Sequence, residues 1–142
     1  MSTPTEHSLS GADFIRQFFP NSPFVAHLGI QLIDIQPGVA TLALPFASAL
    51  VTIGTIVHGG AIASLIDTAA MVAAWSDTEV PAKARGTTVN LTVAFLASAE
   101  KEDLQAVARV LRRGRNLVYL DVEVRSASGN AVAKGLVTYK LG

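Results

Sequence analysis

The stretch VTIGTIVHGGAIASLIDTAAMVAAWS, residues 51–76, decides the fold of this chain. It opens as a short apolar segment, passes through His58-Gly59-Gly60, and continues as an alanine-rich run that is apolar on nearly every side. A helix that is apolar all round is normally buried, so the pattern predicts a central helix from about Gly59 to Trp75. Its many alanines would let a sheet or a second helix approach the backbone closely.

One carboxylate, Asp67, lies in the middle of this apolar run. No other Asp, Glu, Lys or Arg occurs between Ile35 and Ser76. Burying an unpaired carboxylate is costly, which leaves two interpretations. Asp67 is a structural group that bridges a local hydroxyl, such as that of Ser64 or Thr68, or its ionised form takes part in function.

Alternating apolar and polar residues predict strands on both sides of this helix. They are expected at 30–36 and 39–45, around the Pro37-Gly38 turn, and at 88–95, 104–111, 117–125 and 131–141, with turns at 112–116 and 128–130. Within 88–95, the alternation places Val89, Leu91 and Phe95 on one face and Thr88 on the other.

The order of these elements predicts how they pack. A loose tail, a short helix capped by Ser10 and a helical turn at 24–28 precede the first strand. One apolar helix and one sheet can cover each other only if the sheet curls around the helix. The sequence therefore predicts a single α+β domain with a wrapped antiparallel sheet.

Composition excludes several classes of function. The chain has 142 residues, of which 50% are hydrophobic and 15% charged, and its eleven basic residues balance its eleven acidic ones. This balance gives no broad electrostatic surface for nucleic acid. The absence of cysteine excludes disulfides and thiolate chemistry. No transmembrane run or signal peptide is apparent, so we expect a cytoplasmic protein, and the high apolar fraction predicts an oligomer interface.

Three motifs together resemble the hotdog-fold thioesterases, and most closely the PaaI-like acyl-CoA thioesterases of the phenylacetate pathway. They are His58-Gly59-Gly60-x6-Asp67-Thr68-Ala69, the strand TTVNLTVAFL at 87–96, and Gly114-Arg115 followed by Ser128-Gly129-Asn130 and Ala133-Lys134-Gly135. The resemblance spans roughly 29–142. It implies a tail with short helices at 1–28 and one hotdog domain at 29–142, in which a curled antiparallel sheet wraps one long central helix.

The same resemblance implies an activity and an assembly. The expected reaction is hydrolysis of an acyl-CoA thioester to the free acid and coenzyme A, with no cofactor and no metal. The expected assembly is a homodimer, or a dimer of dimers that forms a homotetramer. A non-catalytic module that binds or senses acyl-CoA is the alternative, and a hotdog hydratase is a third reading whose usual Asp/His motif is not found here.

The two glycines suit a carbonyl group. A helix N-terminus carries free N–H groups and the positive end of the helix dipole. Gly59 and Gly60 would let a thioester carbonyl approach without a Cβ in the way, so that its developing oxyanion is stabilised. The alternative is a tight strand-to-helix turn without a ligand. The resemblance singles out the N–H of Gly60 as the donor.

The spacing of Asp67 points to a site shared by two subunits. Asp67 follows Gly60 by seven residues, close to two helical turns, so the two lie on one face about 10 Å apart along the axis. An antiparallel helix from a second subunit would bring its own Asp67 beside this Gly60. The resemblance implies that Asp67 is a nucleophile or a general base, and that the hydroxyl of Thr88 holds Asp67 or the attacking water. A strand threonine is otherwise an ordinary β-former.

The remaining candidates support or bind the substrate. His58 could in principle act as a general base, but the resemblance gives it a supporting role that orients the loop. Thr52 stands where the family often has an Asn, or Val51 does if Gly54 is aligned instead. Basic residues near turns are candidates for the coenzyme A phosphates, since the arginine fork suits phosphate; the alternative for each is ordinary surface charge. These candidates are Arg112, Arg113, Arg115, Lys83 and Arg85.

Overall fold

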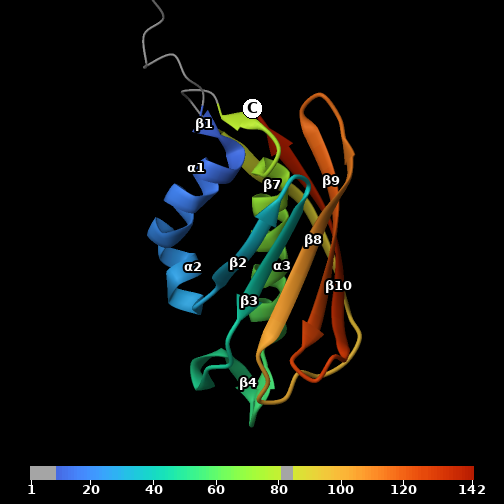
Figure 1. Ribbon diagram of the computed structural model, residues 1–142. Helices are drawn as coiled ribbons and strands as arrows, with labels where there is room; N and C mark the ends of the chain where they lie inside the picture. The colour runs from blue at the N-terminus through green and yellow to red at the C-terminus, as the bar shows by residue number, and fades with distance from the viewer. Residues whose placement is uncertain (1–8, 81–84) are drawn as a thin grey trace, which may run out of the picture.

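The computed structural model describes residues 9–80 and 85–142. Within them, one antiparallel six-stranded sheet wraps around the helix α3, Gly59–Trp75 (Figure 1). The strand order is β2 (Gln31–Gln36), β3 (Val39–Leu44), β8 (Leu104–Arg113), β9 (Leu117–Ser126), β10 (Ala131–Leu141) and β7 (Gly86–Phe95). The wrapped α+β architecture predicted from the sequence is confirmed, and β2 and β7 form the two edges of the sheet.

Shorter elements surround this core. The helices α1 (Gly11–Phe18) and α2 (Pro23–Leu28) precede the sheet, joined by a 3-10 turn at Phe19–Asn21. The N-cap of α1 is Ser10, as expected from the sequence, and its side chain accepts a hydrogen bond from the N–H of Asp13. Before α3 lie a 3-10 turn at Ser48–Leu50 and a hairpin of β4 (Val51–Ile53) with β5 (Ile56–Val57). A second small pair joins β1 (Leu9–Ser10) to β6 (Glu79–Val80).

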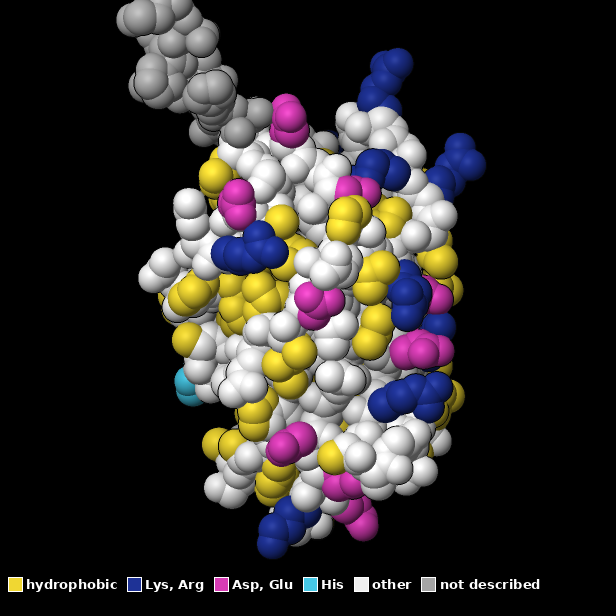
Figure 2. Space-filling model, in the orientation of Figure 1, with side chains coloured by type: hydrophobic (Ala, Val, Ile, Leu, Met, Phe, Trp, Pro, Cys, Tyr) yellow, Lys and Arg dark blue, Asp and Glu magenta, His cyan; other side chains and the backbone are white. Residues whose placement is uncertain are grey.

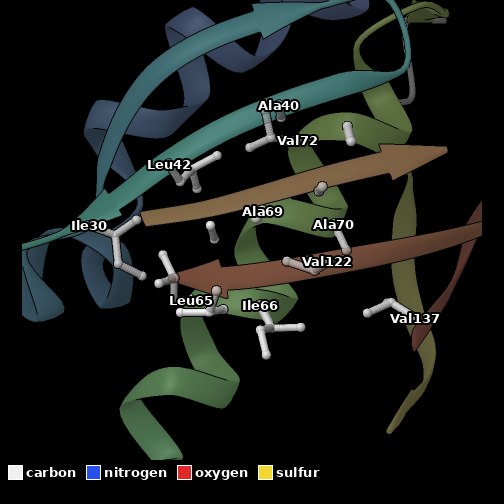
Figure 3. Packing of buried hydrophobic residues seen from close by; sticks show 14 of the residues in the cluster. Ile30, Ala40, Leu42, Leu65, Ile66, Ala69, Ala70, Val72, Val122 and Val137 are labelled. Atoms are coloured by element: carbon white, nitrogen blue, oxygen red, sulfur yellow. The ribbon is translucent and has the colours of Figure 1, made fainter. Parts of the chain in front are cut away.

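The core lies between α3 and the concave face of the sheet (Figure 3). Leu65, Ile66 and Ala69 of α3 are fully buried, with 0% of their surface exposed, and the sheet contributes Leu42 and Val122 at the same level. Complete burial of a Val, Leu or Ile side chain is worth about 1.5–3 kcal/mol. The alanines of α3 allow the helix to lie close against the strands.

Gly135 marks the closest approach of β10 to α3. A Cβ at this position would lie 2.6 Å from Cγ2 of Ile66. We expect Gly135→Ala to lower the free energy of unfolding by about 1–3 kcal/mol, measured by urea denaturation, because a close-packed core cannot absorb the added methyl group. In an Ile66→Ala background the clash is gone, so the same substitution should cost much less; equal costs in both backgrounds would contradict this explanation.

A β-bulge corrects one sequence-based prediction. The pairing of β7 with β10 shifts register between Thr138 and Tyr139, so that Tyr139 pairs with Thr88 while Thr138 pairs with Asn90. Paired residues share a face, and the extra residue in β7 therefore turns Thr88 toward α3, together with Leu91. Strict alternation had placed Thr88 on the opposite face, and a bulge is not visible in an alternating pattern.

The outer surface differs from the core in charge. Figure 2 shows Lys, Arg, Asp and Glu side chains along β8 and β9, on the right-hand side of the view. On the convex face of the sheet, Lys134 donates to Asp121 at 3.0 Å. Among the residues that the structure describes, no helix is long and apolar enough to cross a membrane.

Candidate active site

One stripe of α3 is left uncovered by the sheet. Its residues are partly or fully exposed and recur at intervals of three and four, so they share one face of the helix. The stripe consists of Gly60, Ala63, Ser64, Asp67 and Met71. The stripe runs along the edge strand β7. Thr88, near the start of β7, contacts Asp67, and Phe95, at the end of β7, lies against Gly59.

Asp67 is half-buried and held from one side. The hydroxyl of Thr88 donates to its Oδ1 at 2.6 Å. The local hydroxyls that could have satisfied it bond to the helix backbone instead: Ser64 donates to the Gly60 carbonyl at 2.8 Å and Thr68 to the Ser64 carbonyl at 2.7 Å. Within residues 9–80 and 85–142, Oδ2 of Asp67 has no hydrogen-bond partner, which leaves one carboxylate oxygen available to a ligand.

The N-terminus of α3 has one N–H bonded and one open. His58 is the N-cap, and its Nδ1 accepts a hydrogen bond from the N–H of Gly60 at 2.7 Å. The N–H of Gly59 has no acceptor in the part of the chain that the structure describes. This differs from the sequence-based choice of Gly60 as oxyanion donor, because the Gly60 N–H is already engaged. The contact places the His58 ring at the start of α3, and its role in orienting the loop stays a prediction.

Gly59 opens into a surface pocket of about 400 Å³. Its wall combines apolar residues with two hydroxyl-bearing ones, and Thr52 from β4 is among them. The lining residues are Thr52, Ile56, Val57, Gly59, Ile62, Phe95, Leu96, Ala97, Ser98 and Ala99. The structure therefore brings Thr52 and Gly59 to one pocket, while Asp67 of the same chain lies further along α3.

The basic candidates gather at the other end of α3. Arg113 donates to the Ala74 carbonyl at 3.0 Å and to the carboxylate of Asp77, so it secures the C-terminal end of the helix. This structural role replaces the phosphate-binding role predicted for Arg113. Both Arg113 and its neighbour Arg112 belong to β8 rather than to the expected turn.

The other basic candidates remain exposed. Arg112 and Arg115 lie at the surface near the β8–β9 connection. Arg85 shares a pocket of about 430 Å³ with Lys140, a residue that the sequence analysis did not single out. Lys83 lies outside the described residues. No group of three or more His, Cys, Asp or Glu side chains that could hold a metal is found among residues 9–80 and 85–142.

A third cavity was missed from the sequence. It lies between α1 and α3 and is lined in part by Met71 and Trp75, which follow Asp67 by four and eight residues. That spacing places both on the Asp67 side of the helix, so the helical period could have identified them. The α1 residues and Tyr139 of β10 carried no comparable signal, because only the tertiary packing brings them to this cavity.

Tyr139 closes this cavity, and its hydroxyl accepts a hydrogen bond from Nε1 of Trp75 at 3.1 Å. Burial raises the pKa of Tyr139; the Trp75 hydrogen bond lowers it, and the charge of Asp67 raises it further. The hydroxyl therefore stays protonated to a higher pH than that of a free tyrosine.

This shift predicts a loss of stability at alkaline pH. Unfolded tyrosine ionises near pH 10, whereas Tyr139 in the folded protein resists ionisation. The contribution of Tyr139 to the free energy of unfolding is thus complete below pH 10. It is lost as the pH rises from 10 toward the raised pKa of Tyr139 in the folded protein, at up to about 1.4 kcal/mol per pH unit for one proton. Urea denaturation between pH 9 and 11 should show a shallower decline for Tyr139→Phe than for wild type; parallel declines would contradict the assignment.

Comparisons with known proteins place this architecture in a class. Residues 54–133 match the sequence profile of the Thioesterase superfamily. A protein of Saccharolobus solfataricus named as a putative esterase is 30% identical over 112 residues, which cover 79% of this chain and 73% of that protein.

Solved structures give the same result. A thioesterase family protein from Silicibacter pomeroyi has a TM-score of 0.84 and 28% identity, covering 92% of this chain and 97% of that one. The E. coli PaaI protein from the phenylacetic acid degradation operon shares the fold, with a TM-score of 0.79, 23% identity, and coverage of 94% and 95%. The fold is a hotdog fold, of the kind that thioester and ester hydrolases use. The chain belongs to the Thioesterase superfamily.

Proposed function

We propose that this protein is an acyl-CoA thioesterase whose active site combines the N-terminus of α3 from one subunit with Asp67 from another. The observation that carries the proposal is a pair of open groups on one helix: the Gly59 N–H and one carboxylate oxygen of Asp67 have no partner among residues 9–80 and 85–142. They are eight residues apart, about 12 Å along the axis, which is too far for both to act on one carbonyl.

The edge strand β7 supplies the means of joining two subunits. It is ten residues long, no neighbour pairs with its outer edge in the described structure, and an exposed apolar edge of this kind favours pairing with another chain. Its exposed side chains include Val89 and Phe95, at 56% and 55%. Antiparallel pairing of two β7 strands would make one continuous sheet with a two-fold axis at its centre.

This pairing would complete the site. Thr88 lies near the start of β7 and Phe95 at its end, so antiparallel strands centred on one another bring Thr88 of one subunit near Phe95 of the other. Asp67 is bonded to Thr88, and Gly59 lies against Phe95. The carboxylate of one subunit would then face the open helix N-terminus of its partner, and each dimer would contain two such sites.

The chemistry follows from the two groups. The thioester carbonyl oxygen accepts from the Gly59 N–H, and the helix dipole stabilises the negative charge that develops there. Asp67, steadied by Thr88, either attacks the carbonyl carbon or removes a proton from the attacking water. In either route the carbon–sulfur bond breaks, and coenzyme A leaves as a thiolate that takes up a proton. Attack by water gives the acid directly, whereas attack by Asp67 gives a mixed anhydride that water then hydrolyses to the acid and the free carboxylate. This reaction consumes only water, so we propose no cofactor.

Coenzyme A would be anchored by charge at the surface. Arg85 and Lys140 line one pocket. The Leu141 N–H donates to the Asn116 carbonyl, which brings the end of β10 beside the β8–β9 connection. Arg112 and Arg115 therefore extend the basic surface at the same end of the sheet. These exposed guanidinium groups have no side-chain partner within the described part of the chain, which suits them to the phosphates of coenzyme A.

The proposal is tested by thiol release. Purified protein is incubated with benzoyl-, phenylacetyl-, hexanoyl- and decanoyl-CoA, and free coenzyme A is measured with a thiol reagent, with p-nitrophenyl acetate as an oxygen-ester comparison. Hydrolysis of at least one acyl-CoA well above the oxygen ester is expected. Binding of acyl-CoA without hydrolysis of any would identify a binding module instead and overturn the enzymatic proposal.

A further inference from the structure

The hairpin of β4 and β5 presents an apolar side chain on a fixed backbone. Ile53, at the end of β4, is 72% exposed, the largest exposed fraction among the large hydrophobic side chains that the structure describes. The hairpin is held from one side by the segment that follows β7. The Val57 N–H donates to the Ala99 carbonyl at 2.9 Å, and the Lys101 N–H donates to the Thr55 carbonyl at 2.9 Å. These bonds fix the position at which Ile53 meets solvent.

Ile53 belongs to a larger apolar surface. It pairs with Ile56 across the hairpin, and Ile56 lines the Gly59 pocket together with Phe95 and Leu96. Phe95 and Leu96 are 55% and 59% exposed. A single exposed hydrophobic side chain is ordinary, whereas several that adjoin one another mark an interaction site. We call Ile53, Phe95 and Leu96 the hairpin patch.

Pairing of two β7 strands directs the hairpin patch toward the partner subunit. The two-fold axis of an antiparallel strand pair is perpendicular to the sheet, so both α3 helices lie on the same side of it. In the proposed dimer Gly59 faces Asp67 of the partner subunit. Figure 1 shows β4 beyond the N-terminal end of α3, at the bottom of the view. The hairpin therefore continues past the partner's Asp67, toward the C-terminal half of the partner's α3.

The lengths of the two elements agree with this placement. The chain from Ile56 to Gly59 is extended and spans up to about 10 Å. In each α3, Met71 and Trp75 follow Asp67 by four and eight residues, about 6 and 12 Å along the axis. The hairpin patch of one subunit thus reaches the part of the other α3 that α1 covers.

α1 offers an apolar side chain at this position. Phe18 is 43% exposed and stacks on Phe14 with ring centroids 5.7 Å apart. Phe14 in turn contacts Trp75 of α3 at 5.3 Å, and the Gly11 N–H donates to the Thr78 carbonyl at 2.7 Å. Because α1 is fixed to the C-terminal half of α3 in this way, Phe18 is held where the partner's hairpin arrives.

We propose that the β4–β5 hairpin of each subunit docks on α1 of the other, with Ile53 against the partner's Phe18, and that this contact supports the pocket at Gly59. The inference rests on the proposed function, because it uses the dimer in which two subunits share the site. A standard interface buries about 800 Å² on each partner. The uncovered stripe of α3 offers mostly small side chains, so the hairpin contact, made twice in each dimer, supplies large apolar ones.

The contact couples assembly to the oxyanion site. The hairpin supplies three of the residues that line the Gly59 pocket, and β5 runs directly into the N-cap His58. Separation of the subunits exposes the hairpin patch to water and removes one support from the pocket wall. An isolated subunit therefore lacks both a facing carboxylate and the full support of its own helix N-terminus.

The contact can be mapped by cross-linking, because the chain contains no cysteine. Ile53→Cys and Phe18→Cys proteins, one of them carrying a purification tag, are unfolded and refolded together and treated with a short bismaleimide. A covalent heterodimer of the two is expected on a denaturing gel. Ile33→Cys replaces Ile53→Cys in the matched control, since Ile33 is also exposed, at 52%, but lies on β2 at the far edge of the sheet. Equal yields from the two mixtures would overturn the contact.

The contribution of Ile53 to assembly is measured by sedimentation equilibrium. Ile53→Ser should raise the dimer Kd about 10²-fold, because an apolar contact is lost twice in each dimer, while Ile33→Ser should leave the Kd within about twofold. The specific activity of Ile53→Ser should fall on dilution and return when the protein is concentrated. A loss of activity that does not depend on protein concentration would indicate a local defect and contradict docking on the partner.

The docking and the proposed function fail in different ways. Hydrolysis of acyl-CoA by wild type, without a cross-link above the Ile33→Cys control, would overturn the docking and leave the thioesterase in place. A cross-linked heterodimer, together with a wild type that hydrolyses no acyl-CoA, would overturn the thioesterase and leave the docking of the hairpin on α1 in place.

Discussion

Replacing Asp67 by asparagine is expected to reduce kcat for acyl-CoA hydrolysis by about 10²–10⁴-fold, the range that a general base contributes. The amide keeps the size of the side chain and can still accept the 2.6 Å hydrogen bond from Thr88. It cannot take a proton from water or attack the carbonyl as an anion. KM should change little, because the acyl-CoA contacts lie elsewhere. Initial rates of thiol release over a range of substrate concentrations separate the two parameters.

Controls at Thr88 separate loss of charge from loss of position. Thr88→Ser keeps the hydroxyl and should stay within a few-fold of wild type. Thr88→Val removes it, frees Oδ1 of Asp67, and should lower kcat about tenfold, since one hydrogen bond of about 1.4 kcal/mol then no longer steadies the carboxylate. A fully active Asp67→Asn protein would remove Asp67 from the mechanism, and equal activities of the Ser and Val variants would remove Thr88.

The parts of the fold that depend on local pattern were predictable. The apolar run at 59–75, with Asp67 as its one charged residue, indicated a buried helix because only Ser64, Asp67 and Thr68 are polar in it, too few for a solvent-facing helix. The alternation of 117–125 gave β9, since one face had to meet that helix. The seven-residue spacing from Gly60 to Asp67 predicted a site shared by two subunits, and this stays a prediction.

Features that depend on tertiary contact were not predictable. The bulge that turns Thr88 toward α3 arises from pairing with β10, so alternation within β7 could not show it. Likewise, Arg113 resembles any exposed basic residue in sequence, and only the fold brings it to the Ala74 carbonyl. The hydrogen bond from the Gly60 N–H to Nδ1 of His58 depends on the side-chain conformation of His58, which the His-Gly-Gly motif does not specify.

Substituting Gly59 by proline is expected to lower kcat by about 10²–10³-fold while the protein stays folded, because it deletes a single N–H from the oxyanion site. Proline is favoured at the first position of a helix, where the N–H has no intrahelical acceptor. The preceding residue, His58, already has φ −62° and ψ 135°, the extended conformation that a following proline requires.

Gly59→Ala is the matched control. It adds a Cβ at 3.4 Å from the Phe95 ring, which is ordinary van der Waals contact, and it keeps the N–H. Its kcat should fall far less than that of the proline variant, because the N–H remains and the added Cβ lies toward the Phe95 ring. Circular dichroism should show both variants folded. If the proline variant were as active as the alanine variant, the carbonyl would have to be bound by another donor, such as a Gly60 N–H released by movement of His58.

The Gly59→Pro variant also tests whether two subunits share the site. Asp67→Asn and Gly59→Pro proteins are each nearly inactive, but a mixed dimer pairs the intact Gly59 of one subunit with the intact Asp67 of the other. Random reassortment makes half of the dimers mixed, and each of these has one intact site of two, so about a quarter of wild-type activity should return after the proteins are unfolded and refolded together. If Gly59 and Asp67 acted within one chain, every site would carry one defect and mixing would restore nothing. Recovery therefore depends on the antiparallel arrangement of the two α3 helices and not merely on the presence of a dimer.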